Sequence, residues 1–407
     1  MVDDLACVSV CGLETVQLNG FINAKTNIKK LQFGEKKCHR MHIGRENNFC
    51  PDLYIDSWKV ETLELEPDIE VEVDEFDGDH HIEDSDKEKY LGDLLSSDGT
   101  NTKNIKERKA KGYGIVDKIN AKLEEVFFGP FSIQVGLIFR CSHFLNSILL
   151  NSEVWYGLTR ADVDELEVVD HSLLRRILSA PSCTPTPMLY LELGCLPIRY
   201  VIMTRRLMFL QYLLQEEESS LLHRFFKAQS ENPDRGDWVE QIKKDLDETK
   251  LDIPMEEIRK MSIEVFRNKV SVAVQNAAFK YLNVEKLKMS KIMYVNHEKF
   301  EIQQYFQPSG MNIDETQLLF QLRSRMVHVK INFKNKYDDT LCPLCKSADD
   351  TQEHVFSCIK LVTNKNIIID SDIKYIHIFH SDVNKQYSAL RMFNSLWIER
   401  KKLLKVD

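Results

Sequence analysis

The feature that most constrains the fold is a group of metal-ligand residues within the stretch "LCPLCKSADDTQEHVFSC". Cys342, Cys345, His354 and Cys358 follow the spacing C-x2-C-x8-H-x3-C. Zinc prefers a tetrahedron of thiolates and imidazole, and the Cys-Pro-Leu-Cys turn directs both of its sulfurs at one centre. His354 and Cys358 are four residues apart, which places them on one face of a helical turn. The spacing predicts a structural zinc site, closed to catalysis because the protein fills all four positions. The alternative is a chance gathering of three free cysteines and a histidine.

The composition predicts the class of protein. A chain of 407 residues exceeds the usual capacity of one core, so we expect two or three domains. No apolar run is long enough to span a membrane, and the first residues do not form a secretory signal. Ten cysteines are too few over this length for a disulfide scaffold. We therefore expect a cytoplasmic or nuclear protein that is neither secreted nor membrane-bound.

Charge is concentrated in one segment. Residues 61–89 hold fourteen acidic residues and two lysines, a net charge of −12 in a chain of net charge −9. The rest of the chain is therefore mildly basic at +3, too little by itself to identify a nucleic-acid ligand. The acidic segment repels itself and is predicted to be a flexible insertion.

From about residue 101 onward, apolar residues recur mainly at helical spacing. The pattern predicts an amphipathic helix over residues 102–125, with a basic face that includes Arg108. A helix that is apolar nearly all round is predicted over 131–155. Further helices are expected over 162–178, 197–215 and 389–404, and the prolines of "APSCTPTP" (180–187) must interrupt the series.

The chain opens with two adjacent carboxylates, Asp3 and Asp4, followed by a short apolar run typical of a buried strand. Nucleotidyl transfer uses carboxylates that hold two divalent metals, and hard oxygen ligands suit magnesium. Two aspartates at the tip of a hairpin would supply part of such a site. A lone pair of aspartates is, however, more typical of a turn.

Taken in order, the motifs resemble the C-terminal portion of a reverse transcriptase from a non-LTR (LINE-like) retrotransposon. Met1-Val2-Asp3-Asp4 matches the aromatic-x-D-D box of the palm hairpin, and Lys37-Cys38 with "MHIG" matches the strand that follows. Tyr90-Leu91-Gly92 matches the Y-L-G of the primer-grip hairpin. "ILLNSEVWYGLT" and "LLRRILSAPSCTPTPMLYLELGCLPIR" resemble the helical thumb, and residues 342–358 match the terminal C-P-x-C … E-H-x-x-x-C motif.

The resemblance implies roles for these residues. Asp3 and Asp4 would hold Mg²⁺ or Mn²⁺, and Tyr90, Leu91 and Gly92 would form the primer grip. An RNA template and a DNA primer would be the partners. The candidates for phosphate contacts are Lys106, Lys109, Arg199, Arg205 and Arg206. The competing interpretation of these five is solvated helix faces.

The expected fold is a helix-dominated α+β chain. Its predicted parts are a palm remnant (1–100, with the insertion 61–89), a helical thumb (101–230), a helical connector (231–336), the zinc motif (337–362) and a helical tail (363–407). Met1 replaces the usual aromatic residue, and the fingers and the first palm aspartate of the family are missing. We therefore expect a truncated polymerase, inactive as it stands. A non-catalytic nucleic-acid- or protein-binding relic, and a helical zinc protein unrelated to transposons, are the alternatives.

Overall fold

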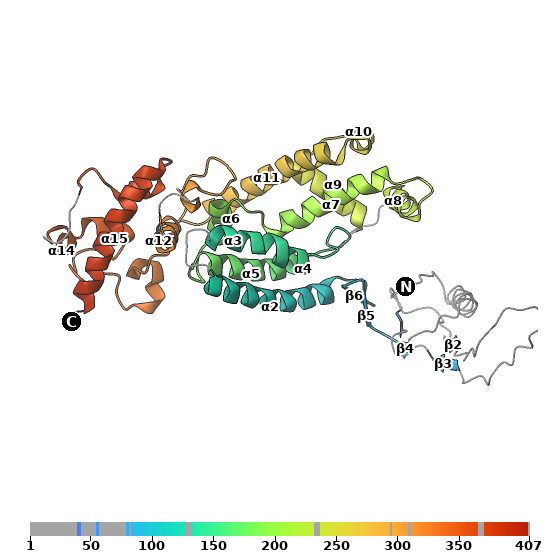
Figure 1. Ribbon diagram of the computed structural model, residues 1–407, viewed down its shortest axis with the longest axis horizontal. Coiled ribbons are helices and arrows are strands. Elements are labelled where there is room, and N and C mark those ends of the chain that lie inside the picture. The colour runs from blue at the N-terminus through green and yellow to red at the C-terminus, as the bar shows by residue number, and fades with distance from the viewer. Residues whose placement is uncertain are drawn as a thin grey trace, which may run out of the picture. The chain divides into compact units, whose positions relative to one another are not determined.

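The computed structural model describes residues 39–41, 54–56, 79–81, 83–126, 132–231, 237–293, 295–307, 311–364 and 370–405 (Figure 1). The chain divides into two compact units, Met1–Glu107 and Arg108–Asp407. Asp3, Asp4 and the Lys37-Cys38 pair lie outside the described residues, as does most of the acidic segment. The two units are described separately below.

In the first unit, the described strands form three small pairs. β1 (His39–Arg40) runs parallel to β4 (Glu83–Asp84), and β2 (Tyr54–Asp56) runs antiparallel to β3 (Asp79–His81). β5 (Lys87–Tyr90) and β6 (Asp93–Ser96) form an antiparallel hairpin, with Tyr90 opposite Asp93. Its two-residue turn has Leu91 at φ 47° and Gly92 at φ 89°. Left-handed conformation at both turn positions matches the twist of the flanking strands. The Y-L-G residues therefore form a hairpin turn, and their role as a primer grip stays a prediction.

The described part of the second unit is built from helices. α2 (Thr102–Val126) begins in the first unit and ends in the second. The α-helices that follow are α3 (Ser132–Phe139), α4 (Asn146–Ile148), α5 (Arg160–Ile177), α6 (Thr186–Leu193), α7 (Ile198–Gln215), α8 (Leu221–Glu231), α9 (Trp238–Thr249), α10 (Met255–Lys260), α11 (Ile263–Leu287), α12 (Ile313–Arg323), α13 (Gln352–Ser357), α14 (Ile359–Val362) and α15 (Val383–Lys405). A π-helix, η2 (Arg140–Leu145), and the 3-10 helices η3 (Gln304–Phe306), η4 (Lys330–Lys336) and η5 (Tyr375–Phe379) complete the described elements. The helix-dominated α+β class is confirmed, whereas the palm and thumb origin stays a prediction. None of the described helices combines the length and the apolar character that a membrane crossing requires.

Most of the predicted helices are present with nearly the expected bounds. α2, α5, α7 and α15 correspond to the helices expected over 102–125, 162–178, 197–215 and 389–404. The start of α5 is fixed by a capping box, in which Thr159 and Asp162 satisfy each other's backbone N–H groups. The prediction that Arg108 belongs to the basic face of α2 is wrong. Its side chain is buried and donates to the carbonyl of Ser147 at 3.0 Å.

The helix predicted over residues 131–155 is present but shorter than expected, because the helical backbone is continuous only from Ser132 to Ile148. The described chain forms α3, the π-helix η2 and α4, and then leaves the helix at Leu149. Arg140, at the start of the π-helix, explains part of the difference because it is a buried cation inside an apolar pattern. Its guanidinium donates to Asp170 at 2.6 and 2.7 Å and to the carbonyl of Leu196 at 2.8 Å. Ile138, in contrast, is 63% exposed, so the segment is not buried all round.

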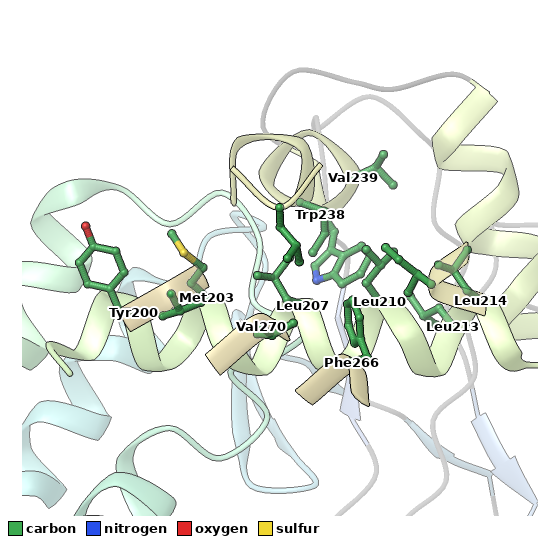
Figure 2. Packing of buried hydrophobic residues seen from close by; sticks show 14 of the residues in the cluster. Tyr200, Met203, Leu207, Leu210, Leu213, Leu214, Trp238, Val239, Phe266 and Val270 are labelled. Atoms are coloured by element: carbon green, nitrogen blue, oxygen red, sulfur yellow. The ribbon is translucent and has the colours of Figure 1, made fainter. Parts of the chain in front are cut away.

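One apolar cluster of the second unit joins α7, α9 and α11. Figure 2 shows side chains of α7 pointing toward Trp238 of α9 and toward Phe266 and Val270 of α11. Burying a large apolar side chain contributes about 1.5–3 kcal/mol, so this cluster is a major source of stability. It contains residues on both sides of the thumb–connector boundary predicted at 230. That boundary therefore does not separate two cores.

Among its described residues, the second unit contains four buried arginine–carboxylate pairs that join separate segments. They are Arg140–Asp170, Arg206–Asp245, Arg323–Glu192 and Arg400–Asp350. Breaking such a pair by removing one partner is costly, because an uncompensated charge is left inside. The pairs therefore fix which segments lie side by side.

Glu192, on α6, is the most connected of these acids. It accepts from the Tyr305 hydroxyl at 2.6 Å and from Arg323 Nε at 3.0 Å, and its Oε1 lies 2.9 Å from His297 Nε2. Burial raises the pKa of Glu192, but the charge of Arg323 and the hydrogen bond with His297 outweigh it and lower the pKa to about 2. The carboxylate is therefore charged and fully enclosed by partners.

Gly194 caps the C-terminal end of α6 and adopts φ +59°. A Cβ built at this position would lie 2.3 Å from backbone atoms of Glu301 and Ile302. Glycine is required here, because it alone permits both the left-handed turn and the close approach of the 301–302 backbone.

Candidate metal centre

The four residues of the C-x2-C-x8-H-x3-C motif converge on one point. The ligand atoms of Cys342, Cys345, His354 and Cys358 all lie within 4.8 Å of one another. Cys342 Sγ is 3.9 Å from Cys358 Sγ, and Cys345 Sγ is 3.2 Å from His354 Nε2. Cys342 and Cys358 are fully buried, whereas Cys345 and His354 are half-buried. It is the one such group of three or more metal-ligand side chains within the part of the chain that the structure describes.

The first two ligands lie on a tight turn. Leu341 forms an antiparallel bridge with Asp349, and the Cys342 N–H donates to the carbonyl of Ala348 at 2.8 Å. The Lys346 N–H donates back to the carbonyl of Cys342 at 3.0 Å, with Lys346 itself at φ 56°. Pro343, directly after the first cysteine, has the fixed φ that favours a turn. The backbone therefore holds both sulfurs in place.

The other two ligands are positioned by α13. Thr351 caps this helix, accepting from the His354 N–H at 3.0 Å, and Cys358 is the residue at its C-terminal end. A cap fixes where a helix begins and so fixes the rotation of the residues that follow. Four residues further on, Cys358 returns to the same side as His354, as the spacing predicted.

The electrostatic surroundings of the Cys345 and Cys358 thiols differ. Hydrogen bonds from the hydroxyl and the backbone N–H of Ser347 lower the pKa of Cys345 to about 6. Burial raises the pKa of Cys358 to about 11. The thiolate is the form that binds metal, so a cation at this centre must supply the stabilisation that burial removes from Cys358.

One edge of the group has the length expected around a tetrahedral zinc ion. Bonds of about 2.3 Å to sulfur place two thiolates about 3.8 Å apart along a tetrahedral edge. The observed 3.9 Å between Cys342 and Cys358 matches this edge. With three thiolates and one imidazole, the donor set is that of structural zinc sites, and no protein position is left open.

Asp350 anchors the centre to the rest of the second unit. This residue is 1% exposed and follows the bridge at Asp349. Its carboxylate lies 2.8 Å from Arg400 of α15 and accepts from the backbone N–H of Lys330 at 2.9 Å. Gln352, the first residue of α13, donates to the carbonyl of Leu322 at 3.0 Å. The segment that carries the four ligands, residues 338–362, is called the metal loop below. Its hydrogen bonds and ion pair attach it to α12, η4 and α15.

The residues predicted to contact phosphate do not form one open basic surface in the second unit. Arg206 is 6% exposed and pairs with Asp245. Arg199 pairs with Glu248 at 2.8 Å and lies over the rings of Tyr200 and Tyr281. These internal contacts disfavour Arg206 as a phosphate ligand, because reaching out would break a buried pair.

The other three candidates differ in exposure. Arg205 donates to the carbonyl of Leu149 and to Asn146 Oδ1, and Lys109 pairs with Glu165. Lys106 is exposed. Phosphate binding stays a prediction for all five residues, and Lys106 is the one whose placement suits it best.

Sequence reasoning missed the residues that support the centre. Asp350 stands in "SADDTQ", which reads as a polar surface loop, and its partner Arg400 is fifty residues away. Ser347 carries no motif at all. Nothing in the local pattern marks these residues, since their roles depend on which helices pack together.

The comparisons with known proteins add no assignment: no protein-family model, curated protein or solved structure matches the chain.

Proposed function

We propose that residues 338–362 form a structural zinc site that holds the C-terminal helices of the second unit together. The observation that carries the proposal is the approach of four zinc-type ligand atoms to within 4.8 Å of one another. Metal binding at such sites supplies much of the local folding energy. The contacts of Asp350 and Gln352 would transmit that order to α12 and α15.

Metal analysis of the purified full chain tests this proposal. We expect one zinc per chain, and cobalt substitution should give the visible absorption of a tetrahedral thiolate complex. The double variant Cys342→Ser, Cys345→Ser should lose the metal. Cys141→Ser, Cys183→Ser is the matched control, because both cysteines are exposed and lie outside the cluster. Full metal retention in the first variant, or no metal in the parent chain, would contradict the proposal.

The wider function is proposed from the sequence motifs. The chain is the C-terminal portion of an RNA-directed DNA polymerase of a non-LTR retrotransposon, with α2 to α7 as its duplex-binding helices. What supports this is the order of the motifs: the D-D box, the Y-L-G hairpin, the helical segment and the terminal Cys/His motif. Asp3 and Asp4 would hold Mg²⁺ or Mn²⁺ in the complete polymerase site. A non-catalytic nucleic-acid- or protein-binding relic is the alternative.

Binding to an RNA–DNA hybrid tests the wider function. Because phosphate contacts release counterions, affinity should fall steeply with salt, and Lys106→Gln should reduce that dependence. Lys280→Gln, a change at an exposed lysine of α11, is the control. No binding to the hybrid at low salt would contradict the assignment.

Extension of a primed RNA template separates the enzyme from the relic. We expect no product from this chain with either magnesium or manganese, because Asp3 and Asp4 by themselves supply only part of the carboxylate set that two-metal catalysis uses. Product that disappears in Asp3→Ala would establish catalysis by this chain and overturn that expectation.

A further inference from the structure

A partly exposed group of aromatic and basic side chains lies directly before the metal centre in the sequence. We name it the aromatic–lysine surface, and it consists of His328, Lys330, Phe333, Lys334, Lys336 and Tyr337. Most of it belongs to η4, the 3-10 helix between α12 and the metal loop. The zinc motif does not use any of these side chains.

The rings of the surface are arranged around His328. The imidazole is exposed and stacks on Phe333, with centroids 5.0 Å apart and planes at 27°. Tyr337 meets it edge-on, at 6.1 Å and 75°. Phe333 and Tyr337 are half-buried, so they are held by the protein while still reaching solvent. Nucleic-acid bases stack on ring groups of this kind irrespective of sequence.

The charge of the surface is opposite to that of the whole chain. Residues 328–337 contain three lysines and no acid, in a protein of net charge −9. Lys334 and Lys336 are exposed, and Lys336 Nζ lies 5.5 Å from the centre of the Phe333 ring. Lys330 Nζ lies 5.7 Å from the Tyr337 ring and 2.8 Å from Asp339. Cations interleaved with rings supply phosphate and base contacts side by side.

The surface is attached to the metal centre through the backbone. The N–H of Lys330 donates to the Asp350 carboxylate at 2.9 Å, and the N–H of Ile331 donates to the Asp350 carbonyl at 3.2 Å. On the other side, Lys291 Nζ donates to the carbonyl of Asn332 at 3.2 Å. These bonds fix the rings before a ligand arrives, which reduces the entropy lost on binding.

We infer that the aromatic–lysine surface binds single-stranded nucleic acid. A single strand is favoured over a duplex because its bases are free to stack on His328 and on the rings beside it. The inference rests on the proposed structural zinc site, since the metal loop positions η4. It assigns a ligand to a surface outside the predicted duplex-binding helices.

Fluorescence anisotropy with the zinc-loaded full chain tests the inference. The probes are labelled pyrimidine oligonucleotides of about twelve residues, one of RNA and one of DNA. Lys334→Gln, Lys336→Gln should weaken binding about tenfold at low salt and lower the salt slope by about 1.4, since each single-strand phosphate contact contributes about 0.7. His328→Ala should weaken binding without changing that slope.

The control Lys269→Gln, Lys280→Gln removes the same charge from exposed positions of α11 and should bind as the parent does. Equal losses in both double variants would mean a general charge effect and overturn the inference. A parent chain that holds zinc but does not bind either oligonucleotide overturns it while leaving the zinc proposal intact. Loss of zinc in a variant would instead point to a structural defect, which metal analysis of each variant detects. In that event His328→Ala decides, because His328 is exposed and is not a metal ligand. Weaker binding with an unchanged salt slope supports the inference, and binding equal to that of the parent overturns it.

Discussion

The apolar cluster of α7, α9 and α11 and the metal loop at 338–362 are stabilised in opposite ways. The cluster contains fifteen buried side chains from three long helices and the segments between them. In residues 338–362, the buried apolar side chains other than the two ligand cysteines are Val355 and Leu361. Ordering one residue costs about 1–2 kcal/mol in backbone entropy alone, so two such side chains cannot offset the cost of the loop. The first region is ordered by burial, whereas the proposed zinc would order the second by binding four of its side chains at once.

The largest expected effect is the removal of the metal. Chelation, or Cys342→Ser with Cys345→Ser, should remove the amide protection of residues 338–362, because structural zinc contributes about 10–16 kcal/mol in small metal-folded peptides. The apolar cluster should keep its protection, since its stability depends on burial. Hydrogen exchange read by mass spectrometry measures both regions in one experiment. Simultaneous loss of protection in α7 and α11 would show that the two regions do not differ in the way described.

The next effect concerns Glu192, the buried acid of α6 that pairs with Arg323 of α12. Glu192→Ala leaves Arg323 without its counter-charge, and we expect a loss of about 3–5 kcal/mol in the free energy of unfolding. Urea denaturation measures it. Asp117→Ala is the control, because that residue is 67% exposed where it pairs with Arg176 and should cost no more than about 1 kcal/mol. Similar losses in the two variants would remove the distinction between buried and exposed pairs.

The same acid predicts a pH dependence. The pKa of Glu192 is lowered to about 2 from an ordinary value of 4.5, so its charge stabilises the folded state above pH 4.5. That contribution should decrease as the pH falls from 4.5 toward 2, where the folded-state carboxylate takes up its proton. Denaturation midpoints measured across this range should fall more steeply for the parent than for Glu192→Gln. Parallel curves would mean that Glu192 does not titrate differently in the two states.

The smallest effect compares one helix cap in each region. Thr351→Ala and Ser262→Ala each remove a side-chain acceptor for a backbone N–H, of His354 and Val265 respectively, and each should cost about 1 kcal/mol. Only Thr351→Ala should also weaken zinc binding, because its helix carries His354. Competition with a chromophoric chelator measures the affinity. An equal change of zinc affinity in Ser262→Ala would contradict the assigned role of the cap.

The sequence by itself determined the local elements and the ligand set. Amphipathic spacing located α2, α5, α7 and α15, and the C-x2-C-x8-H-x3-C motif identified the four side chains that meet in the structure. These features are local, since helical spacing and a two-residue gap between cysteines constrain neighbours along the chain.

Only the tertiary structure decided which charged residues are buried and which residues they pair with. Arg140 interrupts an apolar run, and its partner Asp170 is thirty residues away on α5. Arg206 belongs to a series of arginines that suggested a phosphate-binding face, yet it pairs with Asp245 inside. Asp350 looks like a loop acid but anchors the metal centre through Arg400. A charged side chain is buried only where a distant partner compensates the loss of water, and that partner is set by the packing of helices, which local sequence does not specify.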